Sequence, residues 1–226
     1  MNYTKHKPAK VKKLMVFILL VCALAVFSNP DKPAVRPIKK SGSGVAFDQS
    51  TALLNVGIGL GSRHYYGFNS GFGYRSARTP AFSISYEKPL SKKLGPGILS
   101  LGAYLGFQRA TYRNDDYFFR QVRYFYQHSY NYWYIAARGI YHPDALIWEK
   151  AEIYFGLMLG VRYQTYRYTS NNPDPDARLY ELNHSSIYPT YSFLAGGRWY
   201  FADRAALFGE LGYGISYLTL GVSFKM

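Results

Sequence analysis

The stretch LFGELGYGISYLTLGVSFKM, Leu207 to Met226, decides the fold of this 226-residue chain. From Leu218 onward a large apolar side chain falls on every second position, and the residues between are small, polar or charged. Successive side chains of a strand point to opposite faces, so this period of two predicts a β-strand with one apolar face. Glu210 lies within the first, equally apolar half, which raises the question of which solvent each face meets.

Seven earlier segments repeat this alternation, and each is followed by a turn or a loop. With the closing stretch there are eight segments, and bacterial outer-membrane barrels have an even number of strands. The length of each segment is close to the roughly 9–11 residues that a tilted strand needs to cross a bilayer. The high aromatic content, 19% with 24 tyrosines, is also typical of strands and of membrane interfaces. We find no convincing helical periodicity between Thr51 and Met226. The seven segments are residues 52–61, 81–88, 98–108, 130–141, 152–164, 191–201 and 206–213.

The second face of these segments combines charged residues with many glycines. Small residues have no reason to populate an open surface, but a narrow barrel needs them, because side chains from eight strands compete for one lumen. We therefore expect the apolar face to meet lipid and the charged face to line the interior. The predicted fold is an all-β, eight-stranded antiparallel transmembrane up-and-down barrel. The expected lumen charges are Glu87, Arg138, Glu152, Arg162, Arg198 and Glu210.

The apolar face changes character at both ends of the segments. Three segments turn polar on this face directly after an aromatic residue, namely Phe107, Trp133 and Tyr163. A hydrocarbon boundary with a girdle of aromatic side chains produces this change. The opposite boundary is marked by Tyr86, Tyr141, Trp199 and Phe224.

Connection lengths give the direction of the predicted barrel. Residues 62–80, 112–129 and 165–189 are long connections, whereas those at 89–97, 142–150 and 202–204 are shorter. Outer-membrane barrels have short periplasmic turns and longer external loops, so we expect both termini in the periplasm. The last external turn, near Gly214, is an exception because it is very short.

The N-terminus has the layout of a secretory signal peptide. Five lysines precede an apolar run that ends near Cys22, and the small-x-small pattern Ala23–Ala25 follows. An uncleaved anchor, cleavage after Ser28 and lipidation of Cys22 are the alternatives. We expect residues 1–25 to be the signal peptide, residues 26–49 a flexible periplasmic leader and residues 50–226 the barrel domain.

Charge and residue types exclude several classes of function. The formal net charge is +14, and about +9 is left once the signal peptide is removed. For an exported basic protein, anionic lipid is a nearer partner than nucleic acid. The glycines follow the strand pleat and form no phosphate-binding loop. Cys22 is the only cysteine, so no disulfide framework is expected in the mature chain.

The chain from about Thr51 to Met226 resembles the small eight-stranded outer-membrane barrels of the OmpA/OmpX kind. Its tyrosine-rich strands and the ending FGELGYGISYLTLGVSFKM are similar to outer-membrane β-barrel domains of Bacteroidetes-type bacteria. One departure is that Lys225 and Met226 follow Phe224, where many such barrels end in an aromatic residue. The resemblance implies export to the Gram-negative outer membrane, insertion by the barrel assembly machinery, and a plugged lumen.

We expect a structural role for the lumen charges, each compensating another where water is scarce. A second hypothesis is a narrow conduit for small solutes. The arginines near the external end, Arg109, Arg113, Arg123 and Arg167, are expected either to be solvated or to contact lipopolysaccharide phosphates.

A third hypothesis is an enzyme that modifies lipid A, with His64, His128 or His184 as the base. Ser129 follows His128 directly, and neighbours on a strand point to opposite faces, so this pair cannot act together. Asp174, Asp176 and Glu181 lack the spacing of a calcium loop, and His142 is expected to be exposed in a turn. We therefore predict no catalytic residues, no metal and no cofactor, and a structural or surface-interaction role through long external loops. Protein partners are unknown.

Overall fold

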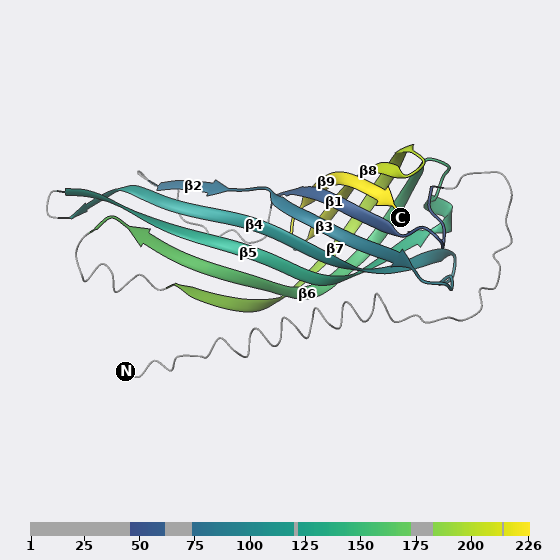
Figure 1. Cartoon of the computed structure of the whole chain (residues 1–226), viewed down its shortest axis with the longest axis horizontal. Helices are drawn as coiled ribbons and strands as arrows, with labels where there is room; N and C mark the ends of the chain where they lie inside the picture. The colour runs from purple at the N-terminus through teal and green to yellow at the C-terminus, as the bar shows by residue number, and fades with distance from the viewer. Residues whose placement is uncertain (1–45, 62–73, 120–121, 173–182, 214) are drawn as a thin grey trace. The chain divides into compact units, whose positions relative to one another are not determined.

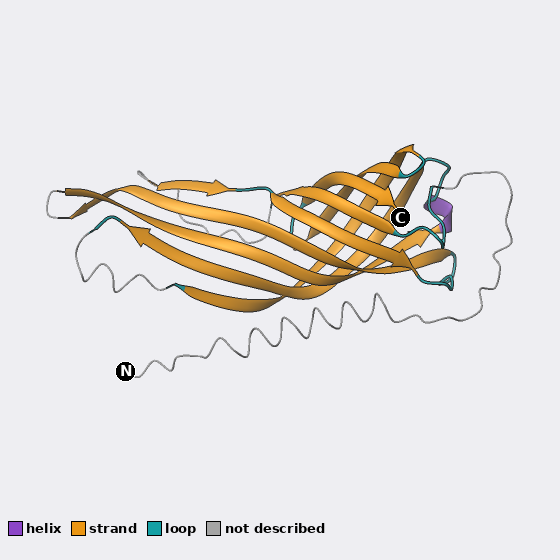
Figure 2. Cartoon of the chain, viewed as in Figure 1, coloured by secondary structure: helices purple, strands orange, loops and turns teal. Residues whose placement is uncertain are grey.

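The computed structural model describes residues 46–61, 74–119, 122–172, 183–213 and 215–226. All of them belong to the compact unit Gly44–Met226. Among these residues the fold is β-structure with a single turn of 3₁₀ helix, η1 (Asp144–Leu146), as Figure 2 shows. The strands are β1 (Leu53–Leu60), β2 (Tyr74–Arg78), β3 (Ala81–Pro89), β4 (Gly97–Phe119), β5 (Val122–Pro143), β6 (Ala151–Ser170), β7 (His184–Ala202), β8 (Ala205–Tyr213) and β9 (Leu218–Lys225).

The strands close into a ring of antiparallel pairs. The order β4-β3-β1-β9-β8-β7-β6-β5 returns to β4 through the β4–β5 pairing, and β1 joins β9 along the whole of its length. β2 and β3 both pair with β4, and Thr79 and Pro80 separate them. Proline has no N–H to donate to a ladder, so one wall strand is interrupted there. The predicted eight-stranded antiparallel barrel is confirmed.

The outer face of the ring is a belt of exposed apolar side chains. Val56, Ile84, Leu105 and Phe155 each expose more than two fifths of their surface, although leucines and valines are normally buried. A surface of this kind needs hydrocarbon around it, as in a transmembrane barrel. The prediction that the apolar face looks outward is confirmed.

The glycines of the inner face make room for bulky lumen side chains. A Cβ added at Gly196 would lie 2.6 Å from the ring of Tyr154, and Tyr154 itself is fully buried. Gly221 of β9 is similarly crowded by the ring of Phe208 on the neighbouring strand β8. Glycine is therefore required where a neighbouring strand sends a large ring across the interior.

Four strands are much longer than the alternation predicted. β4, β5, β6 and β7 have 23, 22, 20 and 19 residues, whereas β1 and β9 have 8 each. Figure 1 shows β4, β5 and β6 running past the ends of β1 and β9. Most of residues 112–129, predicted to be a loop, lie in β4 and β5, because Tyr112 pairs with His128 and the ladder continues to Phe119 and Val122. The prediction of a long loop there is wrong.

The other two predicted long loops are shortened in the same way. Residues 74–78 form β2, and residues 165–170 and 184–189 belong to β6 and β7, while residues 62–73 and 173–182 lie outside the described part of the chain. β2, β4, β5, β6 and β7 thus form a sheet that continues beyond the barrel. We call this part, residues 74–78, 109–119, 122–131, 162–170 and 184–190, the external sheet.

Candidate functional site

The lumen of the barrel holds a network of buried ion pairs. Arg198 on β7 lies between two carboxylates: its Nη2 contacts Glu87 of β3, and its Nη1 donates to Glu152 Oε1 of β6 at 2.7 Å. All three side chains are fully or almost fully buried. Arg198 Nε also donates to Ser223 Oγ at 3.2 Å. One guanidinium thus connects three strands across the interior.

A second arginine extends the network toward β8. Arg138 on β5 forms a two-pronged pair with Glu210, and its Nε lies 3.5 Å from Glu87 Oε2. The hydroxyl of Tyr154 donates to Glu210 Oε1 at 2.8 Å. The structure therefore places five of the six predicted lumen charges in one continuous network of three carboxylates and two guanidinium groups.

Arg162, the sixth predicted residue, does not join this network. It lies on β6, at the first residue that this strand contributes to the external sheet, in register with Tyr134 and Tyr188. Its side chain is 7% exposed, and the described residues give it no ion pair.

His142 was expected to be exposed in a turn, and this is wrong. It is fully buried, and its Nδ1 lies 2.7 Å from Glu152 Oε2. Phe47 stacks on its ring at a centroid distance of 3.9 Å. The strand alternation could have predicted this, because every second residue of a strand faces the same side. His142 is two residues from the inward-facing Ile140 and four residues from the inward-facing Arg138. The buried Phe47 gave no such signal, since it lies in the segment predicted to be a flexible leader.

Side chains fill the interior around the network. Tyr104, Tyr134 and Tyr154 are buried there, and the cavity that Tyr104 and Glu210 line has a volume of only about 10 Å³. This volume holds about one water molecule. That cavity is therefore too small to hold a solute.

The arginines predicted to contact lipopolysaccharide lie on the external sheet. Arg109 and Arg167 are exposed and stand beyond Phe107 and Tyr163 on the outward face of β4 and β6. Arg113 has a carboxylate partner, since its Nε lies 2.6 Å from Asp115 Oδ1. Arg123 Nε donates to the carbonyl oxygen of Asp115 at 2.7 Å.

The inward face of the external sheet is lined by tyrosines and histidines. His128 Nδ1 lies 2.7 Å from the hydroxyl of Tyr166, and burial lowers the pKa of His128. Burial also raises the pKa of Tyr166. The ring of His128 is therefore hydrogen-bonded to a phenol and not to the hydroxyl of Ser129. The rings of His184 and Tyr166 lie 4.9 Å apart with an interplanar angle of 39°, and His64 lies outside the described residues.

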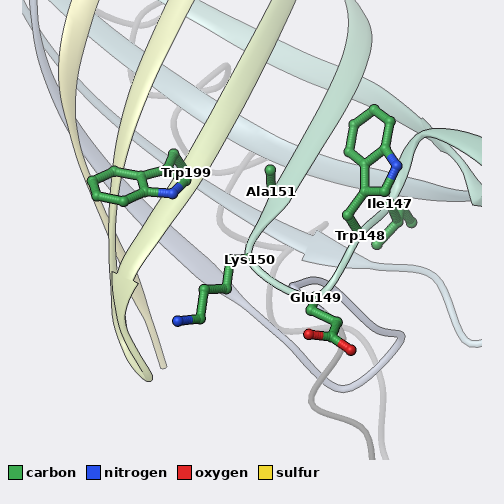
Figure 3. Close-up of a pocket in the computed structure, with 6 residues that line it drawn as sticks. All are labelled: Ile147, Trp148, Glu149, Lys150, Ala151 and Trp199. Atoms are coloured by element: carbon green, nitrogen blue, oxygen red, sulfur yellow. The ribbon is translucent and has the colours of Figure 1, made fainter.

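An open pocket of about 590 Å³ lies at the other end of the barrel, where β6 begins. Figure 3 shows Trp148 and Trp199 on either side of the chain at Ala151, with Lys150 and Glu149 below them. Both indoles are about half exposed. Exposed tryptophans beside charged residues are typical of a membrane interface. The pocket is lined by Ile147, Trp148, Glu149, Lys150, Ala151 and Trp199.

The described residues contain no cluster of three or more histidine, cysteine or acidic side chains placed to hold a metal ion. Within the same residues no helix is long and apolar enough to cross a membrane. Asp174, Asp176 and Glu181, considered for calcium, lie outside the described part of the chain.

Solved structures similar to this chain are small outer-membrane barrels. The N-terminal β-barrel domain of Pseudomonas aeruginosa OprF has 14% identity and a TM-score of 0.38, and the match covers 79% of this chain and 98% of that domain. Ail, the attachment invasion locus protein of Yersinia pestis, has 11% identity and a TM-score of 0.37, with 77% and 93% covered. Ail in complex with the heparin analogue sucrose octasulfate has 8% identity at the same TM-score and coverage. No protein-family model and no curated protein matches the chain.

Proposed function

We propose that this protein is an integral outer-membrane barrel that displays the external sheet at the cell surface for interaction with other molecules. The observation that carries the proposal is the length of β4 to β7, which continue well past the apolar belt that β1 and β9 share with them. Strands that only cross a bilayer need roughly 9–11 residues. The additional length builds an ordered surface in water, which a purely structural anchor does not require.

In this proposal the lumen network is structural. Each of its carboxylates contacts a guanidinium, and removing one partner of such a buried pair leaves an uncompensated charge. The packed interior disfavours the conduit hypothesis, because an eight-stranded barrel leaves an interior just wide enough for side chains. No catalytic role is proposed, since His128 is bound to a tyrosine hydroxyl.

Lipid contact at both ends would hold the barrel at its depth. At the external end, Arg109 and Arg167 would bind lipopolysaccharide phosphates, and at the periplasmic end Trp148 and Trp199 would lie among lipid headgroups. Adding lipopolysaccharide to the refolded protein should raise its thermal midpoint. The double variant R109Q/R167Q should lose most of this increase, whereas K150Q, changed at the opposite end, should keep it.

Labelling of single cysteines on whole cells tests the placement. Thr169→Cys lies on the external sheet and Asp203→Cys in the short turn between β7 and β8, and both positions are exposed. A membrane-impermeant maleimide should label Thr169→Cys on intact cells and Asp203→Cys only after lysis, with the parent chain as the background control for Cys22. The reverse pattern, or labelling of neither variant after lysis, would contradict the proposal.

A further inference from the structure

Among the residues that the structure describes, Arg162 is a buried cation without a counter-ion. Neither its Nε nor its Nη1 makes a hydrogen bond, although both atoms are buried. Burial of a charge is costly unless the charge is paired. Arg138 and Arg198 in the same barrel are each paired with two carboxylates, so Arg162 departs from the rule that the chain otherwise follows.

An unused hydrogen-bond acceptor lies beside this cation. Gln164, the next inward-facing residue of β6, is 4% exposed, and its Oε1 accepts no hydrogen bond. Two aromatic rings complete the surroundings: the guanidinium carbon of Arg162 is 4.8 Å from the ring centre of Tyr188 and 5.7 Å from that of Tyr132. The position therefore combines a positive charge, a neutral acceptor and two ring faces.

The aromatic lining continues outward from this point along β5 and β6. Tyr130 stacks on Tyr132 with an interplanar angle of 4°, and the rings of Tyr130 and Tyr166 lie 5.0 Å apart. Tyr130, Tyr166 and Tyr168 are half-buried. Tyrosine offers an apolar ring face and a polar hydroxyl in one side chain, which suits a ligand with both characters.

We propose that Arg162, Gln164 and the adjoining tyrosines bind an acidic saccharide, with its carboxylate on Arg162 and a sugar hydroxyl donating to Gln164 Oε1. A carboxylate carries the single charge that one guanidinium compensates, and the two groups have matching geometry. A fully ionised phosphate has no proton for Gln164, whereas a sugar hydroxyl has one. The apolar face of a sugar ring would lie on the tyrosine rings.

Tyr188 controls access to this site. Its ring covers the guanidinium of Arg162, yet 39% of its surface is exposed. Exposed side chains change rotamer within picoseconds to nanoseconds, so rotation of Tyr188 would uncover the cation. The arrival of the ligand from outside the cell rests on the proposed function. The chemistry by which the site binds the ligand is independent of that function.

The test is a binding titration with the full chain refolded in detergent micelles. The probes are the trisaccharides of galacturonate and glucuronate, the neutral trisaccharide of galactose, and inorganic phosphate. We expect at least one uronate to bind, and the neutral sugar to bind at least tenfold more weakly. Arg162→Gln should weaken uronate binding at least tenfold. The control Arg204→Gln, in the exposed turn between β7 and β8, should leave it unchanged.

Heat-dependent gel migration shows whether each variant has folded. If Arg162→Gln does not fold, Gln164→Met, which removes the acceptor of the sugar hydroxyl, should still weaken uronate binding by several-fold. Absence of binding by both uronates, equal binding to Arg162→Gln, or phosphate binding as tight as that of the uronates would each overturn the inference. The titration uses purified protein, whereas the labelling test of the proposed function uses whole cells. Either test can therefore fail without changing the result of the other.

Discussion

At the scale of single residues, Arg198 joins three elements that are distant in the sequence. Its guanidinium contacts Glu87 and Glu152 and lies 4.2 Å from the ring centre of Tyr154. If this guanidinium were removed, water could not easily replace its contacts in so tightly packed an interior. The network therefore acts as a set of cross-links that a change of one residue can disrupt.

Arg198→Met should destabilise the folded barrel strongly. It leaves the carboxylates of Glu87 and Glu152 without their main partner, and breaking a buried pair in this way costs about 3–5 kcal/mol. Urea unfolding of the protein in lipid vesicles, followed by tryptophan fluorescence, measures the change. Arg109→Met on the exposed surface should change the free energy of unfolding by less than about 0.5 kcal/mol. Equal midpoints for the two variants would contradict a structural role for the network.

Gly196→Ala should also destabilise the barrel, by about 1–3 kcal/mol, because the added methyl group would press on the ring of Tyr154 at 2.6 Å. Gly139→Ala is the matched control, since on the outward face of β5 the nearest atom would be 3.8 Å away. The same unfolding measurement should separate the two variants. A Gly196→Ala protein as stable as Gly139→Ala would show that the lumen is packed less tightly than described.

His128 should make the stability of the external sheet depend on pH. Burial lowers its folded-state pKa below the ordinary value of about 6.5, so the unfolded chain binds a proton first as the pH falls. The free energy of unfolding should therefore decrease as the pH drops below about 6.5. The variant His128→Gln should show a smaller decrease than the parent chain in unfolding curves recorded between pH 7.5 and pH 5. Parallel curves would contradict the prediction.

At the scale of elements, the alternation predicted eight of the nine described strands and which face of each is apolar, but it missed β2 and the ends of four strands. Polar residues such as Arg109, Thr111 and Arg113 mark the end of the hydrocarbon belt, but this boundary is not the end of the strand. The strands continue because main-chain pairing does not require an apolar face, and Thr111 pairs with Ser129 as regularly as Leu105 pairs with Ile135.

The candidate site was predictable only in part for a related reason. The alternation of inward and outward positions along each strand correctly predicted five residues of the lumen, namely Glu87, Arg138, Glu152, Arg198 and Glu210. The choice of partners depends on the register of strands far apart in the sequence, such as β5 and β8, and no local pattern reports it. The prediction grouped Arg162 with these residues because the alternation shows only that a side chain faces inward. It does not show how far along the barrel axis the residue lies.

The external sheet should protect its amides from hydrogen exchange. The backbone of residues 122–131 is paired with β4, and from Tyr126 onward it is also paired with β6, so these amides should exchange at least a hundredfold more slowly than in an unstructured chain. Hydrogen–deuterium exchange of the protein in lipid nanodiscs, read by mass spectrometry, measures this. Complete exchange of these amides within seconds would restore the loop interpretation.

At the scale of the whole molecule, the packed lumen and the apolar belt have separate consequences. The described interior has a cavity of about 10 Å³ beside Glu210, and tyrosine and charged side chains are buried around it. The protein in planar bilayers should therefore show no stable single-channel conductance. Regular steps, with Arg198→Met giving larger ones, would instead support the conduit hypothesis.

The three tryptophans should report the position of the belt in the bilayer. Trp133 lies against Phe107 at one end, with ring centroids 4.6 Å apart, while Trp148 and Trp199 flank the pocket at the other end. Each exposes between 42% and 54% of its surface. Indole rings favour the level of the headgroups. Lipids brominated near the headgroup should thus quench all three, and lipids brominated near the chain ends should quench them little. Variants that keep one tryptophan, with phenylalanine at the other two positions, assign the signal to single residues. Strong quenching of Trp133 by lipids brominated near the chain ends would mean that the apolar belt extends beyond Phe107 along the external sheet.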